Sequence, residues 1–291
     1  MQLTFTKGHG TENDFVLVRD LDATVDLTAE QVRRITDRHA GLGADGVIRV
    51  VRARDVPEVA DQAESAEWFM DYRNADGVAA EMCGNGVRVF VSYLLREGLV
   101  DGLSWDGGEL AVATRAGTKR VRVDGDELAV DLGPWRVVGG EQALDDGGDA
   151  RVAVHGLDGS VAGLSLDLGN PHTVVMLPNE TDLAALDLTD APHVTPEPPN
   201  GTNVEFVVML GAGHVRMRVH ERGVGETRSC GTGAAAAALA ARAWTNVAGG
   251  GEPDAWRVDV PGGTLRVLLR PGGTVELAGP AELVADGTLT L

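Results

Sequence analysis

Short runs rich in Val, Leu, Ile and Thr recur along the whole chain, often alternate with polar residues, and are bounded by Gly, Asp or Pro. Alternation with a period of two places successive side chains on opposite faces of a strand, and the bounding residues favour turns. The pattern therefore predicts a protein built mainly from short strands. The predicted strands are residues 3–8, 15–19, 46–52, 68–73, 110–117, 119–125, 127–133, 163–169, 173–177, 203–210, 214–223, 255–263, 264–269 and 274–279.

Three segments have the pattern of helices instead. Residues 28–40 begin with Thr28 as a candidate N-cap and Gln31 three positions later, which is a capping box, and their narrow apolar face predicts a surface helix. Residues 86–98 and 233–244 are apolar on nearly every side. A helix without a polar face is buried, so we expect sheets to wrap around these two.

The two halves of the chain share an ordered set of similar segments. Residues 10–18, 43–51 and 72–86 resemble, in the same order, residues 168–176, 201–209 and 219–233. This recurrence predicts an internal duplication. Residues 133–156, between the two copies, are loop-rich, and the Pro-dense residues 192–201 are expected to form an exposed loop.

Composition limits the class of protein and its partners. The 291 residues are 43% hydrophobic, with a formal net charge of −19 and a mean hydropathy of −0.04. This fits a folded globular chain, and the acidity argues against nucleic acid or an anionic membrane as partners. No apolar stretch is long enough to span a bilayer, and the N-terminus lacks the apolar region of a signal peptide. We therefore expect a cytoplasmic protein.

The chain contains two cysteines, Cys83 and Cys230, and each is followed by Gly-x-Gly and a predicted buried helix. Glycines let backbone N–H groups turn toward a bound anion, and the helix N-terminus adds a positive potential that also favours a thiolate. A single cysteine in such a turn is usually a small buried residue. Two in matching frames favour a pair of reactive thiols.

Other uses of the cysteines are less consistent with the sequence. A reducing compartment disfavours a structural disulfide, and the spacings typical of a zinc site, C-x2-C or H-x3-H, do not occur, so we expect no metal. The lysines are Lys7 and Lys119, and neither lies in an obvious pyridoxal-phosphate motif. We therefore expect no cofactor.

Two thiols on opposite sides of one carboxylate would permit inversion at its alpha carbon. One sulfur, as thiolate, would remove the alpha proton, and the other, as thiol, would return a proton from the opposite face. The alpha hydrogen of an amino acid is very weakly acidic, so the helix N-termini would have to stabilise the charge that develops on the carboxylate.

Several polar residues in turns are further candidates. Each has a structural alternative, since Asn is common in turns for local backbone reasons and a His after Pro can be a plain loop residue. Arg222, which follows Glu221, is a natural clamp for a carboxylate. The other candidates are Asn13, Asn74, Asn170, Asn203 and His172.

With these residues in view, the chain strongly resembles the diaminopimelate epimerases, which are cofactor-independent enzymes of lysine and peptidoglycan precursor biosynthesis. The matching segments follow the family's order. They are "KGHGTENDF", "DRHAGLGADG", "YRNADGVAAEMCGNGVR", "LDLGNPH", "GTNVEF", "ERGVGETRSCGTG" and "VPGG".

The resemblance implies a role for each matching residue. Cys83 and Cys230 would be the two bases, and His172 and Glu221 would tune the protonation of the thiols. The remaining implied contacts are with the substrate, diaminopimelate. Gly84, Asn85, Gly231 and Thr232 would hold its reacting carboxylate, and Asn13, Asn74, Asn170, Asn203, Glu221 and Arg222 its distal amino acid end.

The implied fold is α/β (α+β), with two pseudo-symmetric domains, each a mostly antiparallel sheet curled around a central helix, and the active site in the cleft between them. The expected N-terminal domain is residues 1–132 plus 278–291, because the last strand returns to it, and the C-terminal domain is residues 133–277. The resemblance also implies a homodimer. The chain departs from the family in two places. "GTENDF" replaces the common "GLGNDF", which changes the geometry of that turn, and Gly46 stands where many members have Gln, so that this side-chain contact to the substrate is absent.

Two other functions remain open at this stage. A proline or hydroxyproline racemase-like enzyme would share the thiols, but it would have little use for Glu221, Arg222 and the four Asn positions. A redox switch, in which Cys83 and Cys230 form a regulatory disulfide, would not need the Gly-x-Gly frames.

Overall fold

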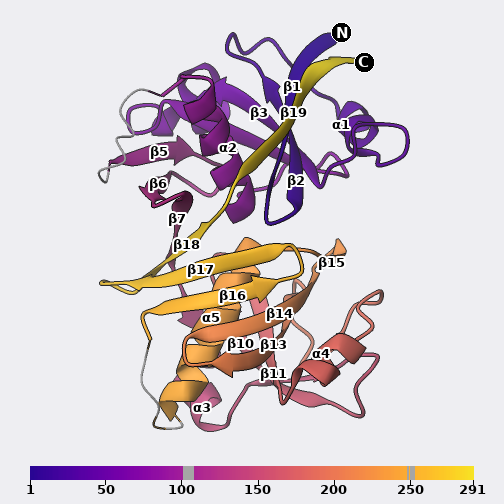
Figure 1. Ribbon diagram of the computed structural model, residues 1–291, viewed down its shortest axis with the longest axis vertical. Coiled ribbons are helices and arrows are strands. Elements are labelled where there is room, and N and C mark those ends of the chain that lie inside the picture. Colours follow the sequence, from indigo (N-terminus) through magenta and orange to yellow (C-terminus); the bar gives the residue numbers. More distant parts are fainter. Residues whose placement is uncertain (101–107, 248, 250–252) are drawn as a thin grey trace. The chain divides into compact units, whose positions relative to one another are not determined.

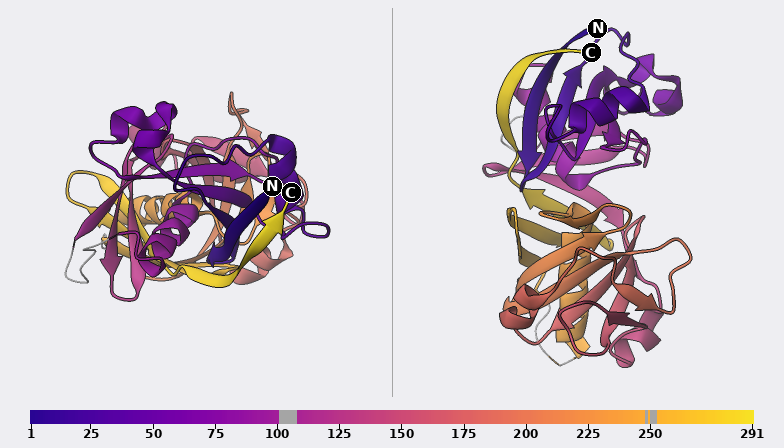
Figure 2. Two further views of the ribbon diagram at one scale, coloured as in Figure 1. Left: turned by 90° about the horizontal axis from the view of Figure 1, so that it is seen from above. Right: turned by 90° about the vertical axis from the view of Figure 1, so that its right-hand side faces the viewer.

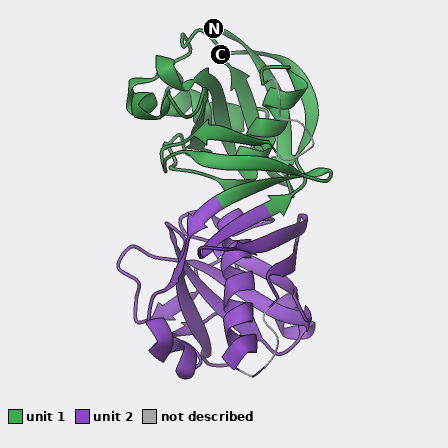
Figure 3. Ribbon diagram, turned by 90° about the vertical axis from the view of Figure 1, so that its left-hand side faces the viewer, with its two compact units in different colours: residues 1–131, 278–291 green, residues 132–277 purple. Residues whose placement is uncertain are grey.

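A computed structural model describes residues 1–100, 108–247, 249 and 253–291. The chain divides into two compact units (Figure 3). Unit 1 consists of Met1–Asp131 and Ala278–Leu291, and unit 2 of Leu132–Leu277.

Strands dominate unit 1 (Figure 1). Its strands are β1 (Gln2–Gly10), β2 (Asn13–Arg19), β3 (Gly46–Arg52), β4 (Trp68–Asn74), β5 (Glu109–Ala113), β6 (Lys119–Asp124) and β19 (Glu282–Thr290), and its helices are α1 (Ala29–Thr36), η1 (Ala53–Asp55), η2 (Pro57–Gln62) and α2 (Gly84–Arg96). The chain passes between the units within β7 (Glu127–Pro134) and again within β18 (Thr274–Gly279).

Unit 2 has the same character. Its strands are β8 (Arg136–Val137), β9 (Ala150–Ala153), β10 (Val161–Asp167), β11 (Pro171–Leu177), β12 (His193–Thr195), β13 (Asn203–Gly211), β14 (His214–Glu221), β15 (Gly225–Thr227), β16 (Ala255–Val260) and β17 (Gly263–Arg270), and its helices are α3 (Gly140–Asp145), α4 (Glu180–Ala185) and α5 (Gly231–Val247).

The strands of the two units pair in the same succession. In unit 1, β1 pairs antiparallel with β2, β2 parallel with β3, β3 antiparallel with β4, β4 parallel with β5, and β5 antiparallel with β6. Unit 2 repeats this series with β10, β11, β13, β14, β16 and β17. The predicted internal duplication is therefore confirmed, and the sheets are mostly antiparallel as expected.

Each sheet curls around one buried helix. In unit 1, α2 packs against β1, β2, β3, β4 and β19, and in unit 2, α5 packs against β10, β11, β13, β14, β16 and β17. The side chains of Ala234 to Ala238 are fully buried, and their small size lets strands approach α5 from every side. The two helices predicted to be buried are thus confirmed, each starting two residues earlier than predicted.

Both faces of β2 are buried, which explains why its sequence does not alternate. Val16 and Val18 belong to an apolar cluster with Val32 and Ile35 of α1. Phe15 faces the other way, toward the first turn of α2 at Gly86. The strand therefore lies between two helices, and a strand covered on both sides is apolar throughout.

The C-terminal strand completes unit 1. As the family resemblance implied, β19 returns to this unit and pairs antiparallel with β1, from Gln2 opposite Thr290. The backbone N–H of Leu291 donates to the carbonyl of Met1, so the two termini lie side by side (Figure 2).

The helix expected at residues 28–40 is shorter than predicted. The capping box of Thr28 and Gln31 is present, but α1 ends at Thr36. The carboxylate of Asp37 accepts hydrogen bonds from the backbone N–H groups of His39 and Ala40, at 2.8 and 2.7 Å. This side-chain contact competes with continued helix and turns the chain away.

Two segments interpreted as loops contain regular structure. Residues 133–156 include β8, α3 and β9, and residues 192–201 include β12, which pairs antiparallel with β9. Val194 of β12 is buried in the apolar cluster beneath α4. These elements are too short for their periodicity to be recognised in the sequence.

None of the helices in the described ranges is long and apolar enough to cross a membrane.

Candidate active site

The two cysteines have the same relation to the helices that follow them. The backbone N–H of Gly86 donates to Sγ of Cys83 at 3.4 Å, and the N–H of Gly233 donates to Sγ of Cys230 at 3.4 Å. The carbonyl of each cysteine accepts the first helical hydrogen bond, at 2.9 Å in both cases. Each sulfur therefore caps a helix N-terminus, where the helix dipole and free N–H groups favour negative charge.

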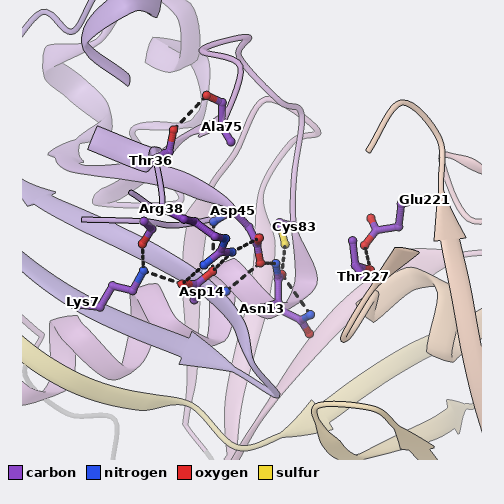
Figure 4. A network of polar contacts seen from close by, with 12 residues as sticks. Lys7, Asn13, Asp14, Thr36, Arg38, Asp45, Ala75, Cys83, Glu221 and Thr227 are labelled. Atoms are coloured by element: carbon purple, nitrogen blue, oxygen red, sulfur yellow. Dashed lines mark hydrogen bonds and ion pairs between the residues drawn. The ribbon is translucent and has the colours of Figure 1, made fainter. Parts of the chain in front are cut away.

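In unit 1, the side chain of Asn13 connects Cys83 to the sheet (Figure 4). Cys83 Sγ lies 3.6 Å from Asn13 Oδ1, and Asn85 Nδ2 donates to the same oxygen at 3.2 Å. Asn13 Nδ2 in turn donates to Asp45 Oδ2 at 2.7 Å. The amide of Asn13 is therefore held in one orientation, with its oxygen facing the thiol and the second residue of α2.

A cluster of charges fixes Asp45 in this position. Arg38 binds Asp45 at 2.7 Å and Asp14 at 2.9 Å, and Lys7 binds Asp14 at 2.5 Å (Figure 4). Burial raises the pKa of Asp45, and the neighbouring charge of Asp14 adds to this effect. Burial also tends to raise the pKa of Asp14, but hydrogen bonds from Arg38 and Lys7 outweigh it and lower that pKa. The charged forms of the two carboxylates are therefore stabilised by Arg38, which contacts both, and by Lys7, which contacts Asp14.

The turn that leads to Asn13 is left-handed. Thr11 and Glu12, between β1 and β2, have φ values of 50° and 61°. Two such residues form the turn that suits a two-residue hairpin, although each non-glycine residue there costs on the order of 1 kcal/mol. "GTENDF" thus forms this turn with Glu12 at the position where the common family sequence "GLGNDF" has its second glycine.

The second departure, Gly46, is dictated by packing. It lies opposite Asn74, where β3 begins and β4 ends. A Cβ atom at position 46 would lie 2.5 Å from the Arg73 carbonyl oxygen and 2.5 Å from the Tyr72 ring. A larger residue here requires β4 to move, and the predicted binding residue Asn74 lies at the end of that strand.

A buried cation supports the first turn of α2. Arg88 is fully buried, and its Nη2 donates to Asn85 Oδ1 at 3.0 Å. Burial lowers the pKa of Arg88 to about 10, against the opposing influence of the Cys83 thiolate and Glu127. The guanidinium remains charged at neutral pH. Arg88 therefore orients the side chain of Asn85 and places a positive charge near Cys83.

In unit 2, a chain of four contacts leads from Glu205 to Cys230. Glu205 Oε1 lies 2.7 Å from His172 Nδ1, and His172 Nε2 lies 3.1 Å from Asn170 Oδ1. Asn170 Nδ2 donates to Thr232 Oγ1 at 3.2 Å, and Thr232 Oγ1 lies 3.7 Å from Cys230 Sγ. Four residues predicted from the sequence, His172, Asn170, Thr232 and Cys230, are thus brought together, with His172 connected to the thiol through the other two.

The surroundings of Cys230 favour the protonated thiol. Burial raises its pKa well above the ordinary value, and the charges of Glu221 and Glu205 raise it further. The Gly233 N–H, which donates to the sulfur, and the Thr232 hydroxyl, which can donate to it, act in the opposite direction and lower the pKa. The thiol of Cys230 therefore stays protonated at neutral pH in this structure.

The remaining predicted residues of unit 2 lie at the ends of β13 and β14. The backbone N–H of Arg222 donates to Asn203 Oδ1 at 2.9 Å, and Asn203 Nδ2 donates to the Pro171 carbonyl at 3.3 Å. Thr227 Oγ1 donates to Glu221. The exposed guanidinium of Arg222 donates to the Asn200 carbonyl at 2.7 Å.

Sequence reasoning missed Glu205, Arg88 and Asp45. Glu205 and Arg88 each interrupt an apolar run, in "NVEFVVML" and in "GVRVFVSYLL", and both are fully buried. A single charge within a buried strand or helix is a usable signal, since such groups are rarely buried without a partner. Asp45 has no comparable signal. Within the described part of the chain, no group of His, Cys, Asp and Glu side chains has the arrangement of a metal site.

Comparisons with known proteins indicate the family of the chain. The family model described as "Diaminopimelate epimerase" matches residues 5–138 and 164–284. The chain is 48% identical to the diaminopimelate epimerase of Streptomyces coelicolor, over 98% of this chain and 95% of that protein. It is 46% identical to that of Thermobifida fusca, over 99% of this chain and 98% of that protein.

Solved structures share the fold at low sequence identity. A hydroxyproline epimerase from Agrobacterium vitis, with bound trans-4-hydroxy-L-proline, has a TM-score of 0.66 at 16% identity and covers 99% of this chain and 92% of its own. A Bacillus anthracis protein of the PhzF family has a TM-score of 0.67 at 16% identity, with all of both chains covered. These two show the fold alone. The family match and the curated relatives, together with the paired cysteine frames, show that the chain belongs to the diaminopimelate epimerase family.

Proposed function

We propose that the protein converts LL-2,6-diaminopimelate into the meso isomer by a two-base mechanism without a cofactor. The observation that carries the proposal is the pair of cysteines that cap two buried helices with the same 3.4 Å hydrogen bond to sulfur. Relatives that are named for this activity and match nearly the whole chain support it.

In the proposed reaction, the two thiols act on opposite faces of one alpha carbon. The thiolate of one cysteine takes the alpha proton, so that a C–H bond breaks and an S–H bond forms. The other cysteine then gives its proton to the opposite face, and its sulfur becomes the thiolate. The N–H groups at the starts of α2 and α5, including those of Gly84, Asn85, Gly231 and Thr232, would stabilise the charge on the carboxylate.

A separate set of residues would hold the distal amino acid end of the substrate. Its proposed members are Asn13, Asn74, Asn170, Asn203, Glu221 and Arg222. Amide oxygens and the carboxylate of Glu221 can accept from the distal ammonium group, and Arg222 can donate two hydrogen bonds to the distal carboxylate. A fixed grip on this end would restrict inversion to one of the two stereocentres.

Deuterium exchange tests the proposal. The purified protein, incubated with LL-diaminopimelate in deuterated water, should produce the meso isomer with deuterium at one alpha carbon. L-Proline and trans-4-hydroxy-L-proline serve as parallel substrates and should gain no deuterium. Exchange into either of these, and none into diaminopimelate, would show that the chain is a racemase of another substrate.

We further propose that the protein acts as a homodimer in the cytoplasm. The family resemblance supports the dimer, and the two free cysteines, Cys83 and Cys230, fit a reducing compartment. The net charge of −19 supports a small molecule, and not nucleic acid or a membrane surface, as its partner. Light scattering during gel filtration and fractionation of cells test the first two statements, and binding assays with DNA and anionic vesicles test the third.

A further inference from the structure

Glu205 is a buried carboxyl group in the middle of an apolar strand. Its side chain has no exposed area, and its neighbours in β13 are the buried residues Val204 and Phe206. Oε1 is hydrogen-bonded to His172, whereas Oε2 is buried and has no hydrogen-bond partner among the residues that the structure describes. Burying a carboxyl group with an unsatisfied oxygen is unfavourable, so packing alone does not account for this residue.

The cysteine frame leaves space for this carboxyl group. A Cβ atom at Gly233 would lie 2.7 Å from Glu205 Oε1 and 3.2 Å from Cys230 Sγ. The second glycine of Cys-Gly-x-Gly in unit 2 therefore lets a carboxyl oxygen and the thiol approach the same point of α5. Glu205 and His172 reach this point from adjacent parallel strands, since Val174 lies opposite Glu205 and His172 opposite Asn203.

The contacts of Asn170 fix the direction of hydrogen bonding. Asn170 Nδ2 donates to Thr232, so Asn170 Oδ1 is left to accept from His172 Nε2, which must carry a hydrogen. The 2.7 Å contact between His172 Nδ1 and Glu205 Oε1 then requires one further proton between these two atoms. The two residues together hold that proton, as an imidazolium beside a carboxylate or as an imidazole beside a carboxylic acid.

This direction of hydrogen bonding leaves the hydroxyl hydrogen of Thr232 free to point toward the sulfur of Cys230. Thr232 Oγ1 already accepts from Asn170, so its own hydrogen is available to Cys230 Sγ, 3.7 Å away. This donor opposes the burial and the charges of Glu205 and Glu221, which raise the pKa of Cys230. The two ring nitrogens of His172 face Glu205 and Asn170.

We propose that Glu205 is a positioning residue which, through His172 and Asn170, directs the hydroxyl group of Thr232 toward the sulfur of Cys230. The role rests on the proposed epimerase function, in which Cys230 must give up and regain a proton. Glu205 does not touch the reacting atoms. It keeps His172 in the form that carries hydrogen on Nε2, and so keeps a donor ready at the sulfur whenever the thiolate forms.

Two substitutions separate positioning from charge. In Glu205→Gln, the amide Nε2 can donate to His172 Nδ1, so His172 keeps its hydrogen on Nε2 although the charge is lost. Glu205→Met has a similar volume but no donor, so nothing fixes the ring. We expect kcat to fall less than about tenfold in Glu205→Gln and about a hundredfold in Glu205→Met, with KM nearly unchanged in both. A misplaced group can lower the rate about a hundredfold.

Glu180 of α4, half exposed and paired with Arg216, provides matched controls. Glu180→Gln and Glu180→Met should leave kcat unchanged.

Nitrogen-15 NMR of the ligand-free wild-type protein tests the same proposal without a variant and without epimerase activity. His172, assigned by comparison with His172→Gln, should show a directly bonded hydrogen on Nε2 near neutral pH. A hydrogen on Nδ1 alone, or equal kcat values in Glu205→Gln and Glu205→Met, would overturn the positioning role. A protein that shows the expected His172 signal but exchanges no alpha proton would instead overturn the proposed function.

Discussion

Gly86 and Cys83 are joined by a hydrogen bond from the glycine N–H to the cysteine sulfur, at 3.4 Å, and this bond gives the thiol a structural role besides the chemical one that we propose. The cysteine occupies the N-cap position of α2, where Ser, Thr, Asp and Asn are usual because their oxygen accepts from the first turn. The stability of the helix and the reactivity of the thiol therefore depend on the same atom.

Substitution of Cys83 should separate the two roles. Cys83→Ser keeps an acceptor at the N-cap, whereas Cys83→Ala removes it, so we expect Cys83→Ala to be less stable by about 1 kcal/mol. Both variants should lose epimerisation, because neither offers a thiolate. Urea denaturation and the deuterium exchange assay measure the two effects. Equal stability of the two variants would show that the sulfur does not cap the helix, and near wild-type exchange in either would contradict the two-base assignment.

The second glycine of each frame should respond differently to a methyl group. At Gly233 the added Cβ meets Glu205 Oε1 at 2.7 Å, but at Gly86 the nearest contact is Cys83 Cβ at 3.3 Å. Both positions lie in the first turn of a helix, so the effect of alanine on helix propensity is similar. We expect Gly233→Ala to lower the melting temperature and kcat more than Gly86→Ala. The opposite order would mean that Glu205 moves aside without cost.

Much of the structure around the two cysteines could be predicted because it depends on short, local segments of the sequence. The Cys-Gly-x-Gly frames, the capping box at Thr28 and the apolar helices each depend on residues close together in the sequence. The contact between Glu205 and His172 depends instead on the parallel pairing of β11 and β13, with His172 opposite Asn203. Such a register is set by the whole sheet, and no local pattern specifies it.

The charge cluster around Asp14 is a second contact that no local sequence pattern specifies. Lys7, Asp14, Arg38 and Asp45 come from β1, from β2, and from the segment between α1 and β3. Each side chain looks like an ordinary surface charge in the sequence. Only the hairpin turn at Thr11 and Glu12 and the pairing of β2 with β3 bring them to Asn13.

Arg88 should control how readily Cys83 ionises. Its buried guanidinium is charged at neutral pH, and the attraction between it and the Cys83 thiolate stabilises both charged forms. In a Cys230→Ser background, Arg88→Gln should slow the alkylation of Cys83 by iodoacetamide roughly tenfold at neutral pH, the scale of a nearby charge. Arg88→Lys, which keeps a cation, should lie between Arg88→Gln and the parent. Alkylation of Arg88→Gln at the parent's rate would show that the charge does not reach the sulfur.

The raised pKa of Cys230 should make the protein less stable in alkali. Burial, together with Glu221 and Glu205, holds the folded-state pKa well above the ordinary 9.0. At a pH above 9.0 the thiol loses its proton in the unfolded chain but keeps it in the folded chain. The folded state then binds more protons than the unfolded state, so the free energy of unfolding falls as the pH rises. The loss should approach about 1.4 kcal/mol per pH unit between the unfolded-state and the folded-state pKa.

Cys230→Ser keeps a helix-capping acceptor but does not titrate there. Urea denaturation of both proteins from pH 8 to about 10.5 should show the wild type losing more stability than Cys230→Ser, because all other titrating groups are common to the two. Parallel curves would mean that the thiol of Cys230 ionises equally in the folded and unfolded chains, so that its buried surroundings do not keep it protonated.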